Sequence, residues 1–383
     1  MLRQREFRRL WTATTIDAFG SWLLVMALPL HVFASTGSIG STGLTLAVEA
    51  APALLVGLWA GSLVDRWPRR RVLVLGNLVA AAGVVLLLAP APVVGGVPVS
   101  VLGGLLVESV AGCFLQPALA ATLPAVVGTG PALVTANAWT SASTSVLRML
   151  GPPAGTLLVV HGDFRVVVLV DAASYLVAAA LLARLRIVEP QSARPVLPSL
   201  GAALRAGVVE VARTKMGSGL IVTTWLFWAA NAALTIVLVA RAGASVGWLI
   251  AGLGLGYLLG SALSKITIFR YATRTVLTTG YLAVGSCFVV AFATPALWVI
   301  ALAGVPGAVI SVAVRHRLQA DTPELLLGRV FAVFGASDAA AAVIGALAAP
   351  LLGPVTLSAV VLGVAALAFV LLPAGLSVPS GSR

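Results

Sequence analysis

The chain has 383 residues, of which 60% are hydrophobic and only 9% are charged, and its mean hydropathy is +1.07. A water-soluble fold cannot hide so much apolar surface, so the composition excludes most soluble enzymes and indicates a protein that resides in lipid. A formal net charge of +12 would suggest nucleic-acid binding in a soluble protein, but the positions of these charges indicate a membrane topology instead.

Long apolar runs, punctuated by glycine, proline and charge, predict six membrane-spanning helices in the first half of the chain. The N-terminus resembles a secretory signal, since arginines precede an apolar run. The run is long and contains Asp17, so we expect an uncleaved first helix. The six predicted spans lie at residues 10–34, 43–63, 71–90, 98–120, 132–160 and 166–185.

Six further spans are predicted in the second half of the chain. Each span needs roughly 20 residues, so the length has room for about twelve helices and no sizeable soluble domain. We expect an all-α membrane protein with one bundle over residues 1–185, a cytoplasmic linker with an interfacial helix over 186–216, and a second bundle over 217–383. The later spans lie at residues 217–240, 246–265, 274–293, 296–316, 329–350 and 354–373.

The basic residues gather at the N-terminus, in alternate loops and at the C-terminus. Of the 24 Lys and Arg residues, only Arg165 and Arg241 fall in the opposite loops, and only Arg148 falls in the interior of a predicted span, away from its ends. Cytoplasmic loops carry an excess of Lys and Arg. The bias therefore predicts that both termini and the linker lie in the cytoplasm.

Six charged side chains fall in the interior of the predicted spans, away from the span ends. Each would cost roughly 2.5–3.5 kcal/mol if it faced lipid near the bilayer centre, so we expect them to face the bundle interior or water. Such groups serve either as proton sites or as structural pairs that join helices. They are Asp17, Glu49, Glu108, Asp171, Asp338 and Arg148.

Helical spacing places several of these groups on polar stripes. Asp17 shares a face of the first span with Thr14 and Ser21, Glu108 recurs with small or polar residues every four positions, and Arg148 ends a stripe that begins at Asn137. We hypothesise that Arg148 neutralises Asp17 or Glu108 and is released when the acid binds a proton. Glu49 and Asp338 are further proton-coupling candidates. A permanent salt bridge that locks the helices is the alternative.

The two halves resemble distant copies of each other. Gly57-x-x-x-Gly61-Ser62 enters the loop after the second span, and Gly256-x-x-x-Gly260-Ser261 enters the loop after the eighth. A lone G-x-x-x-G pattern is weak, because glycine pairs commonly pack membrane helices. Its recurrence at the same place in each half favours two pseudo-symmetric bundles that rock around a central site.

The loop after the second span carries a specific pattern. It resembles G-x-L-x-D-R-x-G-R-R, the signature loop of the major facilitator superfamily of transporters, with Pro68 in place of the usual glycine. We expect this loop to hold the cytoplasmic side closed, with Asp65 at the positive N-terminal end of the eleventh span, which begins near Arg329. Arginines that only set the membrane topology are the alternative. The matching residues are Gly61, Leu63, Asp65, Arg66, Arg69 and Arg70.

A second, partial resemblance lies in the fifth span. Gly151-Pro152-Pro153-Ala154-Gly155 is similar to the G-P-x-x-G-G end of a motif that major facilitator antiporters carry in this helix. Proline frees a backbone carbonyl and glycine admits a neighbouring helix, so Gly151, Pro152 and Gly155 are candidates for a bend on which a bundle pivots. A plain packing kink is the alternative.

The overall pattern resembles the bacterial drug and macrolide exporter branch of that superfamily. The resemblance implies proton-driven efflux of a small amphipathic organic molecule across the bacterial cytoplasmic membrane. A solute importer of the same fold and a lipid flippase are the alternatives. A membrane-embedded enzyme would need catalytic groups clustered near one interface, and the polar groups here lie at mid-membrane depth.

Aromatic and amide side chains supply the candidate substrate contacts. Asn137 lies on the fifth span, whereas the other four lie on the seventh and eighth spans. Tryptophan in membrane proteins also anchors helices at the interface, which is the alternative. The four are Trp225, Trp228, Asn231 and Tyr257.

The sequence has no G-x-x-x-x-G-K-[ST] loop for nucleotide and no H-E-x-x-H motif for metal, and its three histidines and two cysteines are scattered. We therefore expect no cofactor, no metal and no nucleic acid. The expected partners are a small-molecule substrate, protons and membrane lipids, with the monomer as the working form.

Overall fold

The computed structural model describes residues 5–64, 67–128, 131–187, 208–209, 211, 213, 217–293, 297–322 and 327–372. The chain divides into two compact units. The N-terminal unit comprises Met1–Pro198 and Gly243–Gly247, and the C-terminal unit comprises Ser199–Ala242 and Trp248–Arg383. Each is described by itself. Most of the predicted linker, residues 186–216, lies outside the described residues, so the predicted domain limits stay predictions.

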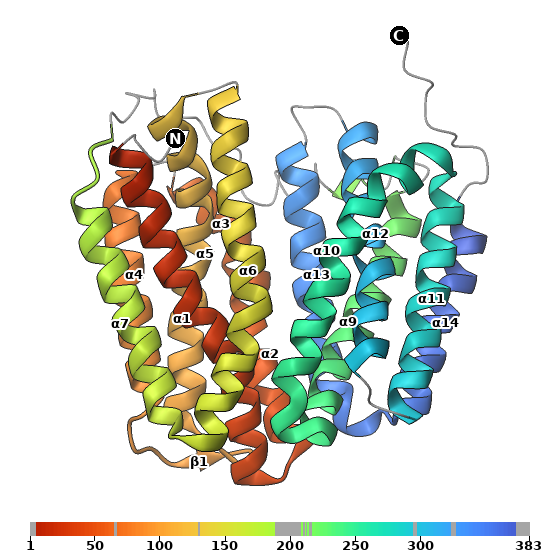
Figure 1. Ribbon diagram of the computed structural model, residues 1–383, viewed down its shortest axis with the longest axis horizontal. Helices are drawn as coiled ribbons and strands as arrows, with labels where there is room; N and C mark the ends of the chain where they lie inside the picture. The colour runs from red at the N-terminus through yellow and green to blue at the C-terminus, as the bar shows by residue number, and fades with distance from the viewer. Residues whose placement is uncertain are drawn as a thin grey trace. The chain divides into compact units, whose positions relative to one another are not determined.

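The N-terminal unit is built of long helices (Figure 1). Helix α1 packs against α6 and α7, and α4 packs against α5 and α7. Buried apolar side chains such as Leu24, Val84 and Leu105 form a core shared by these helices. The elements are α1 (Arg5–Thr36), α2 (Ile39–Leu55), α3 (Gly57–Val64), α4 (Arg69–Leu86), β1 (Val93–Val94), β2 (Val97–Pro98), α5 (Val99–Val127), α6 (Pro131–His161) and α7 (Phe164–Ala183).

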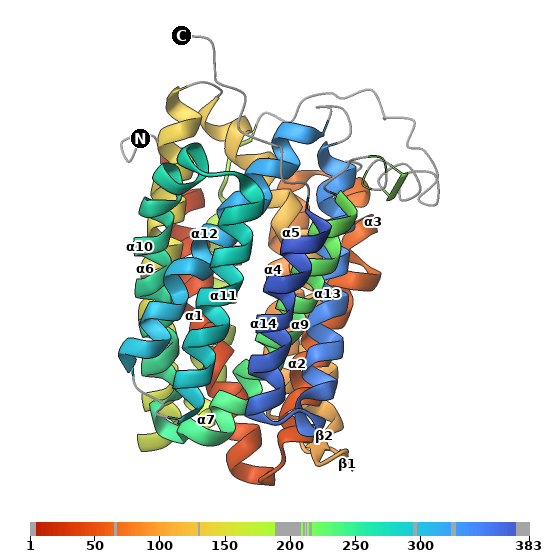
Figure 2. The same cartoon turned by 90° about the vertical axis from the view of Figure 1, so that its right-hand side faces the viewer.

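The C-terminal unit is also helical (Figure 2). Helix α9 packs against α13 and α14, and α11 packs against α12 and α14. The elements of this half of the chain are α9 (Gly217–Ala242), the 3-10 helix η1 (Gly243–Ser245), α10 (Val246–Arg270), α11 (Thr273–Ala293), α12 (Leu297–Asp321), α13 (Leu327–Ala348), the 3-10 helix η3 (Ala349–Leu351) and α14 (Pro354–Leu371).

Helices occupy every stretch where the sequence predicts a span, and the bounds differ by a few residues. The second predicted span is the exception, because it is broken at Val56 into α2 and α3. Pro52 removes one backbone donor from the helix, and Gly57 has a low helix propensity, so two weak positions fall within a turn and a half. The backbone N–H of Val56 donates to the Pro52 carbonyl at 2.7 Å and closes α2.

A short hairpin joins α4 to α5, which the hydropathy pattern does not predict. Val94 pairs with Val97, and the two-residue turn consists of Gly95 and Gly96, both at positive φ. Glycine adopts this conformation without the steric cost that other residues incur. The Ser41 hydroxyl donates to the Gly95 carbonyl at 2.8 Å and ties the turn to α2.

Seven segments of the described chain are helical, long and apolar enough to cross a membrane. Two shorter apolar helices, Ile39–Leu55 and Ala359–Leu371, accompany them. The protein is therefore a multi-pass membrane protein, while the count of twelve spans stays a prediction. The seven segments are Arg5–Thr36, Val99–Val127, Phe164–Ala183, Gly219–Ser264, Thr273–Ala291, Leu297–Leu318 and Val333–Leu351.

Candidate functional site: buried carboxylates and an aromatic pocket

A hydrogen-bonded chain links three helices inside the N-terminal unit. The Tyr175 hydroxyl of α7 donates to Glu108 Oε1 of α5 at 3.1 Å. The same hydroxyl lies 3.1 Å from Ser21 Oγ of α1. Because Tyr175 donates to Glu108, Ser21 donates to Tyr175 in this chain, and its 3.2 Å contact with the Asp17 backbone carbonyl is the alternative use of the same proton. Glu108, predicted as a proton site, is thus joined to the helix that carries Asp17.

Two further carboxyl groups lie beside this chain. Asp171 of α7 is fully buried, and its neighbour Ser174 donates to the Asp171 backbone carbonyl at 2.7 Å. Gly20 of α1 lies directly against the Asp171 and Ser174 side chains, where any Cβ would collide with them. Asp17 Oδ1 and Asp171 Oδ2 are both buried without a hydrogen-bond partner. We name Asp17, Glu108 and Asp171 the carboxylate cluster.

Among the described residues, no Arg, Lys or His forms an ion pair with the carboxylate cluster. The described part of the chain also holds no group of three or more Asp, Glu, His or Cys arranged to bind a metal ion. Negative charges that share a buried site repel one another, and in a low-dielectric interior this repulsion is strong. Binding a proton relieves it.

The ion pair expected between Arg148 and Asp17 or Glu108 does not form in this structure. The Arg148 guanidinium instead lies 5.0 Å from the centre of the Trp22 ring, a cation–π contact between α6 and α1. The side chain of Arg148 is exposed. Helical spacing predicts the face of α6 on which Arg148 lies. It does not predict which residues of α1 stand opposite Arg148 along the helix axis.

The polar stripe of α6 is exposed on the N-terminal unit. Asn137, Ser141 and Thr144 are exposed, and Ser145 is half-buried. The hydroxyls of Thr144 and Ser145 donate to carbonyls one turn earlier in their own helix. Glu49 of α2 is exposed as well. Hydroxyls satisfied by their own helix are tolerated in a membrane, whereas Asn137 and Glu49 require water or another polar partner.

The C-terminal unit contains a pocket of about 380 Å³ between α9, α12 and α13. Aromatic side chains form much of its wall, and Asp338, Arg315 and Ser311 supply polar groups. Asp338 Oδ1 is buried without a hydrogen-bond partner, and among the described residues Asp338 and Arg315 form no ion pair. The aromatic residues are Phe227, Trp228, Phe331 and Phe334.

Of the candidate substrate contacts, Trp228 lines this pocket, together with the proton-coupling candidate Asp338. Trp225 and Asn231 lie on the same helix but are not among the lining residues. Tyr257 of α10 packs beside α12, where a Cβ on Gly307 would lie 3.2 Å from its hydroxyl. Asn137 belongs to the other unit.

The predicted gate residues fall into three groups. Asp65, Arg66 and the side chain of Arg329 lie outside the described part of the chain, and for Gly61 only the helical backbone is described. Arg69 Nη1 donates to the Ala121 carbonyl of α5 at 2.9 Å, and Arg70 is exposed.

The third group packs α6 against α1. A Cβ on Gly151 or Gly155 would collide with the backbone of Trp22 or Leu23, and α6 continues as one helix through Pro152. This finding favours the packing alternative for the fifth-span motif.

No motif or polar stripe of the sequence pointed to Tyr175 or to the aromatic residues of α13. Tyr175 follows Asp171 by four positions on an otherwise apolar helix, so an acid and a phenol on one helical face were the available signal. Phe331 and Phe334 lie one turn apart, also on one face of α13, and Asp338 lies one turn beyond Phe334. That they share a pocket with Trp228 depends on helix packing that no local pattern carries.

Two bundles of apolar helices, with ionisable groups buried inside them, define a membrane transporter rather than an enzyme. The family model of the Major Facilitator Superfamily matches residues 10–242. The chain belongs to the Major Facilitator Superfamily, and as a transporter of this kind it moves a small-molecule substrate.

Two relatives in curated collections cover most of the chain. An uncharacterised MFS-type transporter of Mycobacterium tuberculosis is 32% identical over 361 residues, which are 86% of this chain and 80% of the relative. The multidrug efflux pump Tap of Mycolicibacterium fortuitum is 27% identical over 368 residues, 89% of this chain and 88% of the relative. These similarities place the chain near the drug-exporter-like members of the family.

Among solved structures, a bacterial homologue of the iron transporter ferroportin in an inward-facing state is similar to this chain. The TM-score is 0.76, with 15% sequence identity and coverage of 97% of this chain and 98% of the other. At this identity the similarity supports the fold alone.

Proposed function

We propose that the protein exports a small amphipathic organic molecule in exchange for protons. The observation that carries the proposal is the carboxylate cluster of α1, α5 and α7, which lacks a described counter-cation. An acid inside a membrane bundle is costly unless it is neutralised or serves a function. The hydrogen bonds through Tyr175 offer a route by which a proton on Glu108 affects α1.

In the proposed cycle, Asp17 and Glu108 bind protons from one side of the membrane and release them to the other. Protonation of Glu108 changes its hydrogen bond with Tyr175 from one that a carboxylate accepts to one shared with a carboxylic acid. This change in the Glu108–Tyr175 hydrogen bond also affects the Tyr175 hydroxyl that contacts Ser21 and so joins α7 to α1. Glu49, exposed on α2, and Arg148, which lies over the Trp22 ring, are the proposed accessory groups of the coupling set.

The pocket of the C-terminal unit is the proposed substrate site. Its aromatic wall suits an apolar ring system, and Asp338 and Arg315 suit the polar end of an amphipathic molecule. Trp228 offers the largest aromatic surface in this pocket. Asp338 is also the second proposed proton site, because it lines this pocket and carries one buried oxygen without a hydrogen-bond partner.

The direction of transport is proposed from the relatives. The multidrug efflux pump Tap shares 27% identity over nearly the whole chain, and Gly151–Gly155 partly resembles a motif of major facilitator antiporters. The charge bias of the loops supports cytoplasmic termini, which would place the Arg69–Arg71 end of the N-terminal unit inside the cell.

The first test is a susceptibility screen of bacterial cells with and without the gene, across chemically varied toxic compounds. We expect raised tolerance and lower cell content of at least one amphipathic compound, with the difference abolished by a protonophore. Higher cell content in the cells that carry the gene would instead identify an importer.

A pair of tryptophan variants tests the substrate pocket. Trp228→Ala removes the pocket wall, whereas Trp225→Ala removes the same side chain three residues away, outside the lining. We expect Trp228→Ala to weaken substrate affinity about tenfold, equivalent to roughly 1.4 kcal/mol, and Trp225→Ala to change it less than about twofold. Equal effects of the two substitutions on the transport KM would contradict the assignment.

A further inference from the structure

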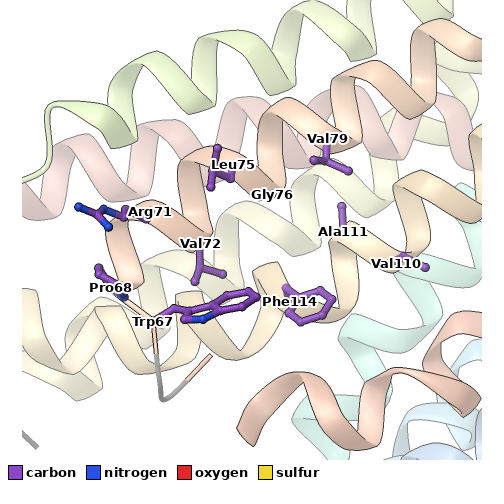
Figure 3. Close-up of a pocket in the computed structure, with 10 residues that line it drawn as sticks. All are labelled: Trp67, Pro68, Arg71, Val72, Leu75, Gly76, Val79, Val110, Ala111 and Phe114. Carbon is purple, nitrogen blue, oxygen red and sulfur yellow. The ribbon is translucent and has the colours of Figure 1, made fainter. Parts of the chain in front are cut away.

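A groove separate from both proposed sites runs along α4 and α5 in the N-terminal unit (Figure 3). Its volume is about 430 Å³. Arg71 and Pro68 lie toward one end, and Val79 and Val110 lie toward the other. From Arg71 to Val79 the helix rises about 12 Å, at roughly 1.5 Å per residue. A single hydrocarbon chain could lie along this length.

The walls of the groove are apolar and open to the outside of the unit. Leu75 is 60% exposed and Val79 is 46% exposed. Trp67 and Phe114 form the remaining wall as a stacked pair, with ring centres 6.4 Å apart and planes 19° apart. Exposed side chains of this kind are covered in a membrane by lipid chains, and a tryptophan beside arginines is typical of the membrane–water interface.

Three consecutive arginines, Arg69 to Arg71, lie near the polar end of the groove, and their side chains have different contacts. Arg69 donates to the Ala121 carbonyl at 2.9 Å, so its charge is used within the unit. Arg70 is exposed and does not line the groove. Arg71 is exposed, lines the groove, and forms no ion pair with a described carboxylate. A cation that pairs with none of the described carboxylates, at the end of an apolar groove, complements an anion that carries an apolar chain.

We propose that this groove binds one anionic phospholipid of the leaflet that faces the Arg69–Arg71 end. Arg71 pairs with the lipid phosphate, and one acyl chain lies along Val72, Leu75 and Val79 against Val110 and Phe114. Basic pockets between membrane helices bind anionic headgroups for this reason. Guanidinium suits phosphate because it can donate two parallel hydrogen bonds.

The test titrates the purified full-length protein in detergent with phosphatidylglycerol and, separately, with phosphatidylcholine of the same acyl chains. Native mass spectrometry counts the lipids that remain bound. We expect one phosphatidylglycerol to bind more tightly than phosphatidylcholine. Arg71→Gln should weaken that binding about fivefold, the contribution of roughly one arginine near a membrane surface. Arg70→Gln, which removes the same charge one residue away, should weaken it less than about twofold.

A third variant tests the acyl part of the groove. Val79→Trp places a large ring at its far end and should lower retention of both lipids. Two results would overturn the proposal: equal affinity for phosphatidylglycerol and phosphatidylcholine, or equal losses in Arg70→Gln and Arg71→Gln. Either outcome would mean that only bulk lipid covers the groove. The arginine pair decides the question even if Val79→Trp fails to fold.

Discussion

Tyr175 is the residue that connects Glu108 of the carboxylate cluster to α1. One hydroxyl reaches both Glu108 Oε1 and Ser21 Oγ, at 3.1 Å each. Hydrogen bonds to charged groups contribute about 1.5–3 kcal/mol, roughly twice the contribution of neutral ones. Loss of this hydroxyl removes the bond while leaving the ring in place.

Tyr175→Phe should therefore slow transport driven by a pH gradient about tenfold, which corresponds to roughly 1.4 kcal/mol. Exchange of substrate without a gradient should change less, because the proposed substrate pocket lies in the other unit. Tyr271→Phe is the matched control, since Tyr271 is 50% exposed and lies outside the cluster. Rates of both processes in proteoliposomes check the prediction, and an equal loss in the two processes would assign Tyr175 a structural role.

At the scale of the element, the crossing of α1 and α6 shows how small residues position the site. Gly155 lies against the backbone of Leu23, and Gly151 against that of Trp22, so the two helices approach closely. Between membrane helices such contact is stabilised by van der Waals packing, because lipid is as apolar as the side chains. The crossing also sets where the Arg148 guanidinium meets Trp22.

Gly155→Ala should destabilise the folded protein by about 1–3 kcal/mol, the usual cost of overpacking. Gly112→Ala in α5 is the matched control, because a Cβ there would meet nothing within 4 Å. Alanine has the higher helix propensity, so this control should be neutral or stabilising by up to about 1 kcal/mol. Thermal unfolding of both variants in detergent measures the difference. A Gly155→Ala protein as stable as the Gly112→Ala protein would contradict the packing account.

At the scale of the whole molecule, the helices could be predicted from the sequence far better than the site. A membrane helix needs roughly 20 apolar residues in succession and satisfies its own backbone hydrogen bonds. Its position along the chain can therefore be predicted from the local sequence. The break at Val56 and the hairpin at Gly95 and Gly96 depend on proline and glycine within otherwise apolar runs. These are local signals that hydropathy alone does not weigh.

The side-chain partners could not be predicted in the same way. Helical spacing correctly grouped Asp17 with Ser21 on one face, but it could not show that Tyr175 would join Ser21 to Glu108. The Arg148 ion pair failed for the same reason, since the relative height of two helices depends on contacts such as Gly151 against Trp22. Trp225 and Trp228 are chemically identical, and only packing with α12 and α13 separates them.

The central claim is that protons on the carboxylate cluster drive transport, and gradient-driven flux in proteoliposomes tests it most directly. An antiporter moves substrate opposite to protons, so the compound identified by the screen should accumulate on the acidic side of the membrane. An Asp17→Asn, Glu108→Gln double variant should equilibrate the compound but no longer concentrate it. Accumulation on the alkaline side, or undiminished gradient-driven accumulation by the double variant, would contradict the account.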